Sequence, residues 1–357
     1  MNIKELDIKY LPQMPANKSR GIGIVGAGAI ITGAQLPAYK IAGFNVVGIT
    51  NRTRSRAESA AKSFDIPNVY DNIEDMLSND DIEILDIALT PDTQMDAVRI
   101  AAPTGRHFLC QKPLHEKPAL AAQIVKMANE AGVKLAVNQQ LRWDGRMRAV
   151  KYLFENGYLG EPTLATINVN IHNPFDLPWL GGDHVEVMYH SIHYFDTIRY
   201  LFGEPDRIFS SGGKLSTQDR PGETRSTTIL EYASGATVLV HSSSNNTMDT
   251  EYAEFRFEGT EGIVRGDFHL FSGAAKGNPR VLTYVSNSLD NRYTFDFHIP
   301  ELRVPHAFIG PMASLMKAIE EDSTPDPSGE DNLNTIRLVN AIYRSMREHR
   351  AIEKSEF

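Results

Sequence analysis

One predicted helix, over residues 188–202, carries polar side chains that could do acid–base chemistry. Their spacing of three or four residues places them on one side of an α-helix. The members of this polar stripe are Tyr189, His193, Asp196 and Tyr200. The opposite, apolar stripe consists of Ile192, Phe195, Ile198 and Phe202. Histidine suits a general acid or base because its unperturbed pKa of about 6.5 lies near neutral pH. The stripe therefore faces either a catalytic cleft or solvent, and solvent is the commoner case.

A lysine follows a short strand that the sequence predicts over residues 108–110. Lys112 and Pro113 come directly after Gln111 in this segment. A lysine ammonium beside a reacting oxygen would stabilise a developing alkoxide. Taken alone, however, Lys112 is best explained as a surface lysine.

A glycine-rich turn, GAGAIITG over residues 26–33, ends the first predicted strand. Glycines in such a turn let backbone N–H groups approach a pyrophosphate at the start of the next helix. The predicted phosphate-binding residues are Gly26, Gly28, Ala29 and Ile30. The third glycine of the fingerprint is absent, because Ile31 stands there and Gly33 comes two residues later. The alternative explanation is a merely tight strand–helix turn.

The loop after the second predicted strand bears on the choice between NAD and NADP. Asn51, Arg52 and Arg54 occupy the place where NAD-selective enzymes commonly put an acidic residue on the ribose hydroxyls. Ser55 and Glu58 have the spacing of a capping box, which predicts that the next helix starts at Ser55. Cations beside a helix N-terminus oppose its dipole, so an incoming phosphate explains the arginines and slightly favours NADP. The alternative is a solvated basic loop, with Asn51 bonding the ribose of NAD.

Further residues are predicted to line a small-molecule pocket. Thr90 and Pro91 follow a third buried strand, and ligands bind beyond the carboxyl ends of parallel strands. Arg142 and Trp143 follow the last strand of the first domain, at a domain junction where pockets tend to form. Trp179 lies on the loop that enters the 188–202 helix, where it would stack on a sugar ring or, equally, fill a core.

Acidic and histidine side chains crowd together between residues 183 and 193, so a metal site has to be weighed. The group comprises Asp183, His184, Glu186, His190 and His193. It lacks the His-Glu-x-x-His order of a helical zinc site and contains no cysteine ligand, so we predict no metal. The single cysteine of the chain, Cys110, is better explained as a packed small hydrophobe than as a nucleophile.

From residue 21 onward, short β-branched runs alternate with longer helical ones. The predicted strands are 22–25, 46–49, 84–88, 108–110 and 134–137, and the predicted helices include 56–64, 98–102 and 120–131. Apolar strands separated by helices indicate a parallel sheet covered on both faces. We therefore predict a Rossmann dinucleotide-binding domain over residues 20–140. Residues 1–19 form an extension that packs on the protein or stays loose.

After residue 140, several strands follow one another and the helices are kept apart. The predicted strands are 164–171, 227–232, 237–241, 253–258, 263–265 and 281–285, and the helices are 147–156, 188–202, 308–320 and 332–348. This arrangement indicates an α+β domain over residues 141–357, with a large, mostly antiparallel, open-faced sheet. An exposed apolar sheet face normally finds a partner.

The composition narrows the class of protein. A length of 357 residues exceeds what one core usually organises, so two domains are expected. Hydrophobic residues at 41% and charged residues at 23% are typical of a soluble globular chain. The net charge of −9 argues against a general nucleic-acid or anionic-membrane partner. Without an apolar leader or a membrane-spanning run, the protein is expected in a reducing cytoplasm.

Together these features resemble the glucose–fructose oxidoreductase, inositol dehydrogenase and rhizopine-catabolism (Gfo/Idh/MocA) oxidoreductase family. The resemblance rests on the glycine turn, on LCQKPL over residues 109–114, on YHSIHYFD over residues 189–196 and on the order of elements. It runs from about residue 21 to the end of the chain. In that family, a Glu-Lys-Pro segment carries a lysine that hydrogen-bonds the reacting oxygen. Lys112 and Pro113 match this segment, whereas Gln111 replaces the glutamate.

The family's second motif has an aspartate, a histidine four residues later and an aspartate three residues after that. His193 and Asp196 match it, and Tyr189 stands in the place of the first aspartate. A phenol with an unperturbed pKa near 10 stays neutral at pH 7, so we expect Tyr189 to be a substrate-pocket hydroxyl. Asp196 is expected either to orient the His193 ring or to cap a buried hydrogen bond.

The resemblance implies an NAD(P)-dependent oxidoreductase (EC 1.1.1.-) that acts on a monosaccharide, cyclitol or related polyol. Hydride would pass between nicotinamide and a hydroxyl or carbonyl group, with His193 as acid/base and Lys112 as electrostatic partner. The resemblance also points to homodimers or homotetramers formed through the second-domain sheet. Two alternatives on the same fold stay open: a non-catalytic dinucleotide-binding regulator, and a glycosidase that uses tightly held NAD.

Overall fold

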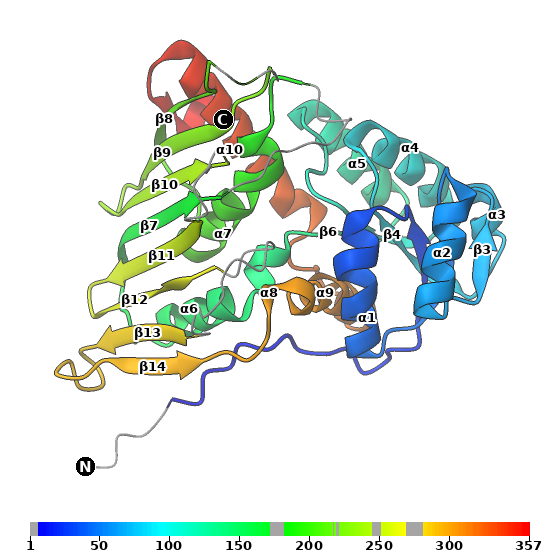
Figure 1. The fold of residues 1–357 in the computed structure, drawn as a ribbon, viewed down its shortest axis with the longest axis horizontal. Coiled ribbons are helices and arrows are strands. Elements are labelled where there is room, and N and C mark those ends of the chain that lie inside the picture. The colour runs from blue at the N-terminus through cyan, green and yellow to red at the C-terminus, as the bar shows by residue number, and fades with distance from the viewer. Residues whose placement is uncertain (1–5, 172–181, 217, 219–220, 245–250, 269–280) are drawn as a thin grey trace. The chain divides into compact units, whose positions relative to one another are not determined.

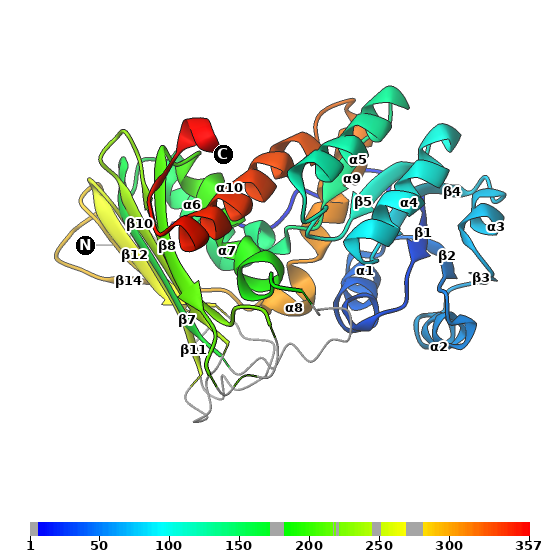
Figure 2. The same cartoon turned by 90° about the horizontal axis from the view of Figure 1, so that it is seen from above.

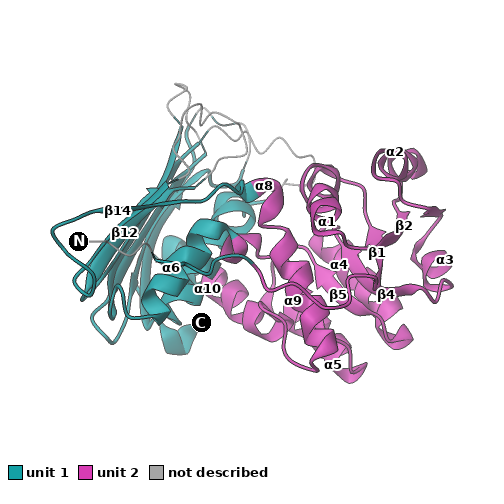
Figure 3. Ribbon diagram, turned by 90° about the horizontal axis from the view of Figure 1, so that it is seen from below, with its two compact units in different colours: residues 1–11, 144–303, 341–357 teal, residues 12–143, 304–340 magenta. Residues whose placement is uncertain are grey.

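The computed structural model describes residues 6–171, 182–216, 218, 221–244, 251–268 and 281–357. The chain divides into two compact units (Figure 3). Unit 1 comprises Met1–Leu11, Asp144–Arg303 and Ala341–Phe357, and unit 2 comprises Pro12–Trp143 and Val304–Asn340. Each unit is built on one sheet. In the described part of the chain, no helix has the length and apolar character needed to cross a bilayer.

Unit 2 contains a six-stranded parallel sheet with the strand order β3-β2-β1-β4-β5-β6 (Figure 1). The strands are β1 (Gly21–Val25), β2 (Val46–Thr50), β3 (Asn68–Tyr70), β4 (Ile82–Ile87), β5 (His107–Cys110) and β6 (Leu135–Val137). Strands covered on both faces are apolar along their length, and every residue of β1 is buried. The order is that of a doubly wound dinucleotide-binding sheet, so the predicted Rossmann fold is confirmed.

Helices cover both faces of the unit 2 sheet. They are η1 (Ile31–Gln35), α1 (Leu36–Ala42), α2 (Arg54–Phe64), α3 (Ile73–Leu77), α4 (Pro91–Ala101), η2 (Ala102–Thr104), α5 (Pro118–Glu130), η3 (Gln140–Trp143) and α9 (Ile309–Glu320). Apolar residues of α1, α2 and α9 share one core cluster with Ile24 and Ile84 of the sheet. In Figure 1, α4 and α5 lie on the other side of the strands from α1 and α9.

The segment that contains α9 belongs to unit 2, whereas the sequence-based division put all of residues 141–357 in one second domain. Met312, Leu315 and Met316 of α9 are fully buried in the cluster shared with α1. Burial of this apolar face against the parallel sheet explains why the chain returns to unit 2 after residue 303. The following helix, α10 (Gly329–Glu348), begins in unit 2 and ends in unit 1.

Unit 1 contains a nine-stranded sheet with the order β14-β13-β12-β11-β7-β10-β9-β8-β15. Its strands are β7 (Pro162–Asn170), β8 (Arg207–Gly213), β9 (Arg225–Glu231), β10 (Thr237–Ser243), β11 (Tyr252–Gly259), β12 (Gly262–Asp267), β13 (Val281–Ser286), β14 (Phe295–His298) and β15 (Ile352–Glu353). Only β7 and β10 run parallel; the other neighbouring pairs are antiparallel. The predicted mostly antiparallel sheet is confirmed.

One face of the unit 1 sheet is covered and the other is open. Side chains of β10 alternate between buried and partly exposed, as one covered face requires. The remaining helical elements are α6 (Gly145–Glu155), η4 (Val187–Ser191), α7 (Ile192–Phe202), α8 (Arg303–His306) and η5 (Lys354–Glu356). Helices α6, α7 and the end of α10 lie on a single face, and no described helix of unit 1 lies on the opposite face (Figure 2).

The described part of the N-terminal extension packs on the protein. The Tyr10 hydroxyl donates to Glu301 at 2.9 Å, and its ring meets Phe297 edge-on at 5.5 Å between centroids. Further along, the N–H groups of Ala16 and Asn17 donate to the Glu320 carboxylate at 3.1 and 2.7 Å. Of the two expectations for this extension, packing therefore holds for residues 6–19.

Candidate active site

The glycine turn lies where three strands of unit 2 end. The Gly26 N–H, just after β1, donates to the Thr50 carbonyl at the end of β2, at 2.8 Å. Gly26 has a φ of +111°, and a Cβ on it would lie 2.6 Å from the carbonyl oxygen of Ala88, which follows β4. Both the backbone conformation and the available space therefore require glycine at this position.

The chain opens at Gly28 and enters a helix. A Cβ on Gly28 would meet no atom within 4 Å, and the Gly28 carbonyl accepts the N–H groups of Ile31 and Thr32, both at 3.1 Å. Backbone N–H groups in a first helical turn, such as those of Ala29 and Ile30, lack intrahelical acceptors and suit a phosphate. A fully buried Ile31 stands in place of the third fingerprint glycine and begins the π-helical turn η1. This turn fits the pyrophosphate of a dinucleotide.

Asn51 ties the loop after β2 to the glycine turn. Its Oδ1 accepts the Ala27 N–H at 3.1 Å, and its Nδ2 donates to the Thr53 carbonyl at 2.9 Å. The side chain thus fixes two loops that would both border a bound dinucleotide. The contact with ribose expected for Asn51 stays a prediction.

The two arginines of this loop differ in their partners. Arg54 donates through Nε to Glu58 at 2.9 Å and also pairs with Asp71. Arg52 is exposed, and no ion pair joins it to the described residues. The predicted capping box is wrong: α2 begins at Arg54, its N-cap residue is Thr53, and no side chain caps it. The Glu58 carboxylate accepts from the Arg54 side chain instead of acting in a cap.

Lys112 lies on a loop after β5 whose backbone is held by a buried glutamine of α4. The Oε1 atom of Gln94 accepts the Gln111 N–H at 2.8 Å. Its Nε2 donates to the carbonyls of Gln111 and Leu114 at 3.0 and 3.1 Å. Thr90 is the N-cap residue of the same helix, which starts at Pro91. The carboxyl ends of β2, β1, β4 and β5, four neighbouring strands, thus carry the residues predicted to contact the dinucleotide.

A buried carboxylate that the sequence analysis did not single out lies beneath this loop. Asp86 of β4 is 1% exposed, and both of its oxygens accept from Gln35 Nε2, at 2.8 and 2.6 Å. The Tyr39 hydroxyl donates to it at 2.7 Å. Burial raises the pKa of Asp86 to about 7, although both hydrogen-bond partners oppose the shift. An acidic residue inside the apolar run ILDI was the sequence signal that could have revealed it.

Cys110 supports the expectation of a packed thiol. It is fully buried on β5. Burial raises the pKa of its thiol, and the negative charge of Asp86 raises it further. A thiol that resists ionisation is a poor nucleophile.

The helix predicted to carry the acid/base residue lies in unit 1 as η4 followed by α7. His193 is 5% exposed and Asp196 is fully buried, so the predicted polar stripe does not simply face solvent. Asp196 lies 3.9 Å from the Arg199 guanidinium. The Tyr200 hydroxyl accepts a hydrogen bond from Arg148 of α6. Tyr189 precedes α7 in the π-helical turn and packs against Val185.

Two buried carboxylates hold the start of this helix. Glu223 accepts the N–H groups of Val185 and Val187 at 3.0 and 2.9 Å, and also the Tyr343 hydroxyl. Glu186 accepts hydroxyl groups from the serines at 191 and 226 and pairs with His190 at 3.2 Å. Burial raises the pKa of Glu223; for Glu186, burial acts in the same direction, but the bonds from His190 and its other partners lower the pKa overall.

Three of the side chains considered as metal ligands, those of His184, Glu186 and His190, have other partners. Glu186 bonds His190, and the His184 ring stacks on Tyr343 at 4.0 Å between centroids. Among the described residues, no group of three or more His, Cys, Asp or Glu side chains could hold a metal ion.

Arg142 and Trp143 are held within unit 2. Arg142 is buried and pairs with Asp326 at 2.9 Å and with Asp331 at 2.6 Å. The Trp143 ring packs so closely on Gly310 of α9 that a Cβ there would overlap it. Their predicted role as pocket walls stays a prediction, and Trp179 lies outside the described residues.

Two amides next to this segment were missed by the sequence analysis. Asn138 and Gln139 follow β6 and are almost completely buried, yet their side-chain atoms form no hydrogen bond with described residues. The Asn138 N–H donates to the carbonyl of Cys110, beside the Lys112 loop. Buried polar groups without protein partners usually bind water or a ligand, so these two amides are further candidate site residues.

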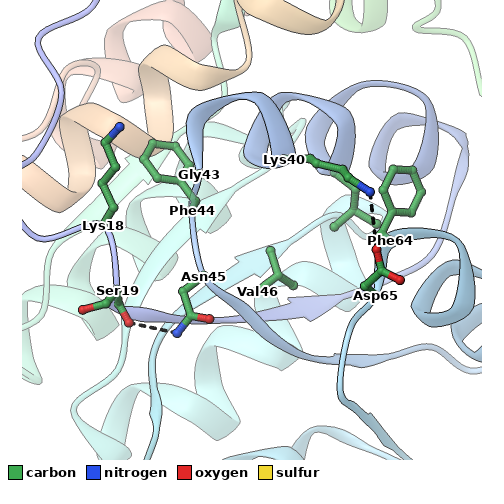
Figure 4. Close-up of a pocket in the computed structure, with 10 residues that line it drawn as sticks. Lys18, Ser19, Lys40, Gly43, Phe44, Asn45, Val46, Phe64 and Asp65 are labelled. Carbon is green, nitrogen blue, oxygen red and sulfur yellow. Dashed lines mark hydrogen bonds and ion pairs between the residues drawn. The ribbon is translucent and has the colours of Figure 1, made fainter.

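A pocket of about 690 Å³ in unit 2 lies at the amino-terminal edge of the sheet (Figure 4). Ser19 and Asn45, which precede β1 and β2, line it and are joined by a 2.9 Å bond from the amide to the Ser19 carbonyl. Lys40 and Asp65 pair across another part of its wall at 3.4 Å. Ligands of open parallel sheets bind at the carboxyl ends, so this pocket is not the dinucleotide site.

Two family models match the chain in consecutive segments. Residues 20–139 match the oxidoreductase family with an NAD-binding Rossmann fold, and residues 147–265 match the GFO/IDH/MocA C-terminal domain. The chain belongs to the Gfo/Idh/MocA oxidoreductase family. The first match falls on the parallel sheet of unit 2 and the second on unit 1, and the family expected from the motifs is confirmed.

Characterised members of the Gfo/Idh/MocA family match over most of their length. The chain is 28% identical over 340 residues to D-xylose 1-dehydrogenase (NADP(+)) 2 of Haloferax volcanii, covering 93% of this chain and 98% of that protein. It is 27% identical to D-apiose dehydrogenase of Paraburkholderia graminis, covering 88% and 84%. The structure of levoglucosan dehydrogenase in complex with NADH and L-sorbose shares the fold, with a TM-score of 0.79 at 19% identity and coverage of 93% and 98%.

Substitutions in the glycine turn should separate folding from nucleotide binding. We expect Gly26→Ala to lower the free energy of unfolding by roughly 2 kcal/mol or more, because alanine is strained at positive φ and its Cβ meets the Ala88 carbonyl. Gly28→Ala should leave stability within about 0.5 kcal/mol but weaken NAD(P)H binding, since its Cβ enters open space. Urea unfolding and titration of NAD(P)H fluorescence measure the two effects. Equal stability of both variants would contradict the structural role given to Gly26 and the binding role given to Gly28.

The buried Asp86 should make stability depend on pH in a defined direction. Its pKa is raised in the folded state, so the folded protein holds this proton more tightly and stability falls as pH rises toward 7. Between pH 5 and pH 8, the wild type should lose about 3 kcal/mol of unfolding free energy relative to Asp86→Asn. Urea unfolding of both proteins at the two pH values measures this difference. A difference in unfolding free energy between the two proteins that is the same at pH 5 and at pH 8 would contradict the raised pKa of Asp86.

Proposed function

We propose that this protein is an NAD(P)-dependent dehydrogenase or reductase of a monosaccharide, cyclitol or related polyol. The observation that carries the proposal is that a Gfo/Idh/MocA chain keeps both Lys112 and His193, with Lys112 on a loop fixed by buried Gln94. The named relatives that match over most of their length, a xylose and an apiose dehydrogenase, support a sugar substrate.

The glycine turn is the proposed cofactor site of unit 2. Gly26 and Gly28 provide the close backbone approach, and the first turn of the following helix provides N–H donors for the pyrophosphate. The other proposed cofactor contacts are Ala29, Ile30, Asn51, Arg52, Arg54, Thr90, Pro91 and Lys112. When bound, the nicotinamide supplies the acceptor or donor of hydride.

His193 and Lys112 are the proposed reacting side chains. During oxidation, His193 takes the proton of the substrate hydroxyl; during reduction it returns that proton to the carbonyl oxygen. The Lys112 ammonium donates a hydrogen bond to the same oxygen and stabilises its developing negative charge. The further proposed substrate contacts are Arg142, Trp143, Trp179, Tyr189 and Asp196.

Association of two or four copies through the open sheet face is part of this proposal. Phe209, Ile229 and Leu239 stand side by side on β8, β9 and β10, and Phe209 is 44% exposed. Apolar side chains in register on an open face suit a self-complementary interface. We place the enzyme in the cytoplasm.

A panel of aldoses and polyols assayed with NAD and with NADP tests the function. The dehydrogenase is supported by net formation of reduced nicotinamide from a free sugar and by release of cofactor on dilution. Turnover of a glycoside without net reduction would instead favour a redox glycosidase. Nucleotide binding without turnover of any substrate would favour a regulator.

Removal of either reacting group should lower kcat on the best substrate. We expect Lys112→Met to lower kcat by a factor of about 10² to 10³, because it removes electrostatic stabilisation of the transition state. We expect His193→Ala to lower kcat by a factor of about 10² to 10⁴, because it removes proton transfer. Lys126→Met, on the exposed face of α5, is the matched control and should keep wild-type turnover. Full activity of His193→Ala would overturn its acid/base role.

The arginines after β2 should differ in their effect on cofactor choice. Arg54 is engaged by Glu58 and Asp71, which leaves Arg52 as the better placed cation for a ribose phosphate. We expect Arg52→Ala to raise the KM for NADP at least tenfold and the KM for NAD less than threefold. Arg54→Ala should change both by a smaller factor. If the wild type prefers NAD more than tenfold and neither variant alters this preference, the prediction that the arginines favour NADP is wrong.

A further inference from the structure

A continuous hydrogen-bond chain runs from the buried Asp86 carboxylate to the backbone of Lys112. Gln35 Nε2 donates to both Asp86 oxygens, at 2.8 and 2.6 Å. Gln111 Nε2 then donates to Gln35 Oε1 at 3.3 Å, and Gln111 Oε1 accepts the Lys112 N–H at 3.0 Å. All of these residues belong to unit 2.

The carboxylate fixes the direction of every bond in this chain. An ionised Asp86 can only accept, so the amide of Gln35 must turn its NH₂ group toward the aspartate. Its Oε1 then points away and needs a donor. Gln111 supplies that donor with its own NH₂ group, which leaves Gln111 Oε1 to accept the Lys112 N–H. The orientation of both amides follows from the charge at the buried end.

The surroundings of Asp86 disfavour any other orientation of the amide groups that bond it. Asp86 lies on the central strand β4, between β1 and β5, and is almost fully buried. The titratable groups that face it are Tyr39 from α1, which donates to Oδ2 at 2.7 Å, and the thiol of Cys110 on β5. Water has little access, so an acceptor that faces another acceptor here would be left unpaired, which is costly in a protein interior.

We propose that Asp86 is a positioning residue for Lys112: through Gln35 and Gln111 it dictates that residue 111 must be a hydrogen-bond donor. The inference rests on the proposed role of Lys112 in hydride transfer. It explains why glutamine stands where the resembled family motif has glutamate. A glutamate at 111 would set a carboxylate oxygen against Gln35 Oε1, and neither atom carries a proton. In this protein the carboxylate lies instead at Asp86, in the interior, on the strand β4 that pairs with β5.

Exchange of the charge between the two positions tests the proposal. Gln111→Glu alone should lower kcat at least tenfold and lower the unfolding midpoint of the protein without ligands. Gln111→Glu combined with Asp86→Asn should recover kcat to within about threefold of wild type. In the double variant, the amide introduced at position 86 can donate to Gln35 Oε1, and Gln35 can donate to the new carboxylate at position 111, so the chain reverses its direction without an unpaired group. The KM for the nucleotide should change by a smaller factor than kcat, because the backbone of the glycine turn itself forms none of the bonds of the chain.

Two controls separate positioning from a general loss of structure. Gln123→Glu makes the same chemical change on the exposed side of α5 and should change neither kcat nor the unfolding midpoint. Gln111→Met neither donates nor accepts, so Asp86→Asn should not rescue it. If Gln111→Glu does not accumulate as a folded protein, a folded and active double variant beside it supports the proposal equally.

The pH dependence gives a second readout. Protonated Asp86 carries a donor, so the ratio of kcat between Gln111→Glu and wild type should rise as pH falls below 7. Wild-type turnover of Gln111→Glu, a double variant no better than the single one, or a ratio that is flat with pH would overturn the proposal. Coupling of 86 and 111 in the unfolding midpoint but not in kcat would also overturn the positioning role. Failure of the proposed function can be told apart from failure of this proposal. In that case Lys112→Met would keep its activity, whether or not positions 86 and 111 are coupled.

Discussion

The buried carboxyl group of Asp86 constrains the interior of the parallel-sheet unit. An ionised carboxylate is stable there only because Gln35 and Tyr39 donate to it, and both lie on the helix that starts at the glycine turn. The same interaction therefore fixes that helix to β4. Through Gln111 it also reaches the loop after β5 that carries Lys112. The proposed cofactor turn and the proposed electrostatic group thus share one buried anchor.

Unit 1 uses the same physical device for the helix that carries His193. Glu223 binds two backbone N–H groups at the helix start, and Glu186 gathers hydroxyl groups and His190 around it. Carboxylates that accept several hydrogen bonds in a low-dielectric interior hold their partners rigidly. Each unit therefore presents its proposed reacting side chain on a backbone that is fixed from inside. Rigid placement of this kind is what general acid–base and electrostatic catalysis require.

The fold was largely predictable from apolar periodicity, because buried parallel strands and amphipathic helices leave strong patterns. Short elements such as β3, β14 and β15 were missed, since two to four residues carry little pattern. The return of α9 to unit 2 was missed as well, because an apolar stripe does not say which sheet it covers. At the site, Lys112 and His193 were suggested by the resemblance of two short motifs to those of the family, since Lys112 alone is best explained as a surface lysine. The partners of Asp86 come from positions 35 and 39, and position 111 joins the same bond chain through Gln35; all three lie far from residue 86 in sequence, so spacing could not reveal them.

In the proposed reaction, the Lys112 ammonium and the His193 imidazole act on the same oxygen of a bound sugar. A crystal structure of the complex with reduced cofactor and the best substrate measures this directly. We expect Lys112 Nζ and a ring nitrogen of His193 both within about 2.6 to 3.2 Å of one substrate hydroxyl. A reacting hydroxyl that contacts neither group, beside a correctly bound nicotinamide, would contradict it.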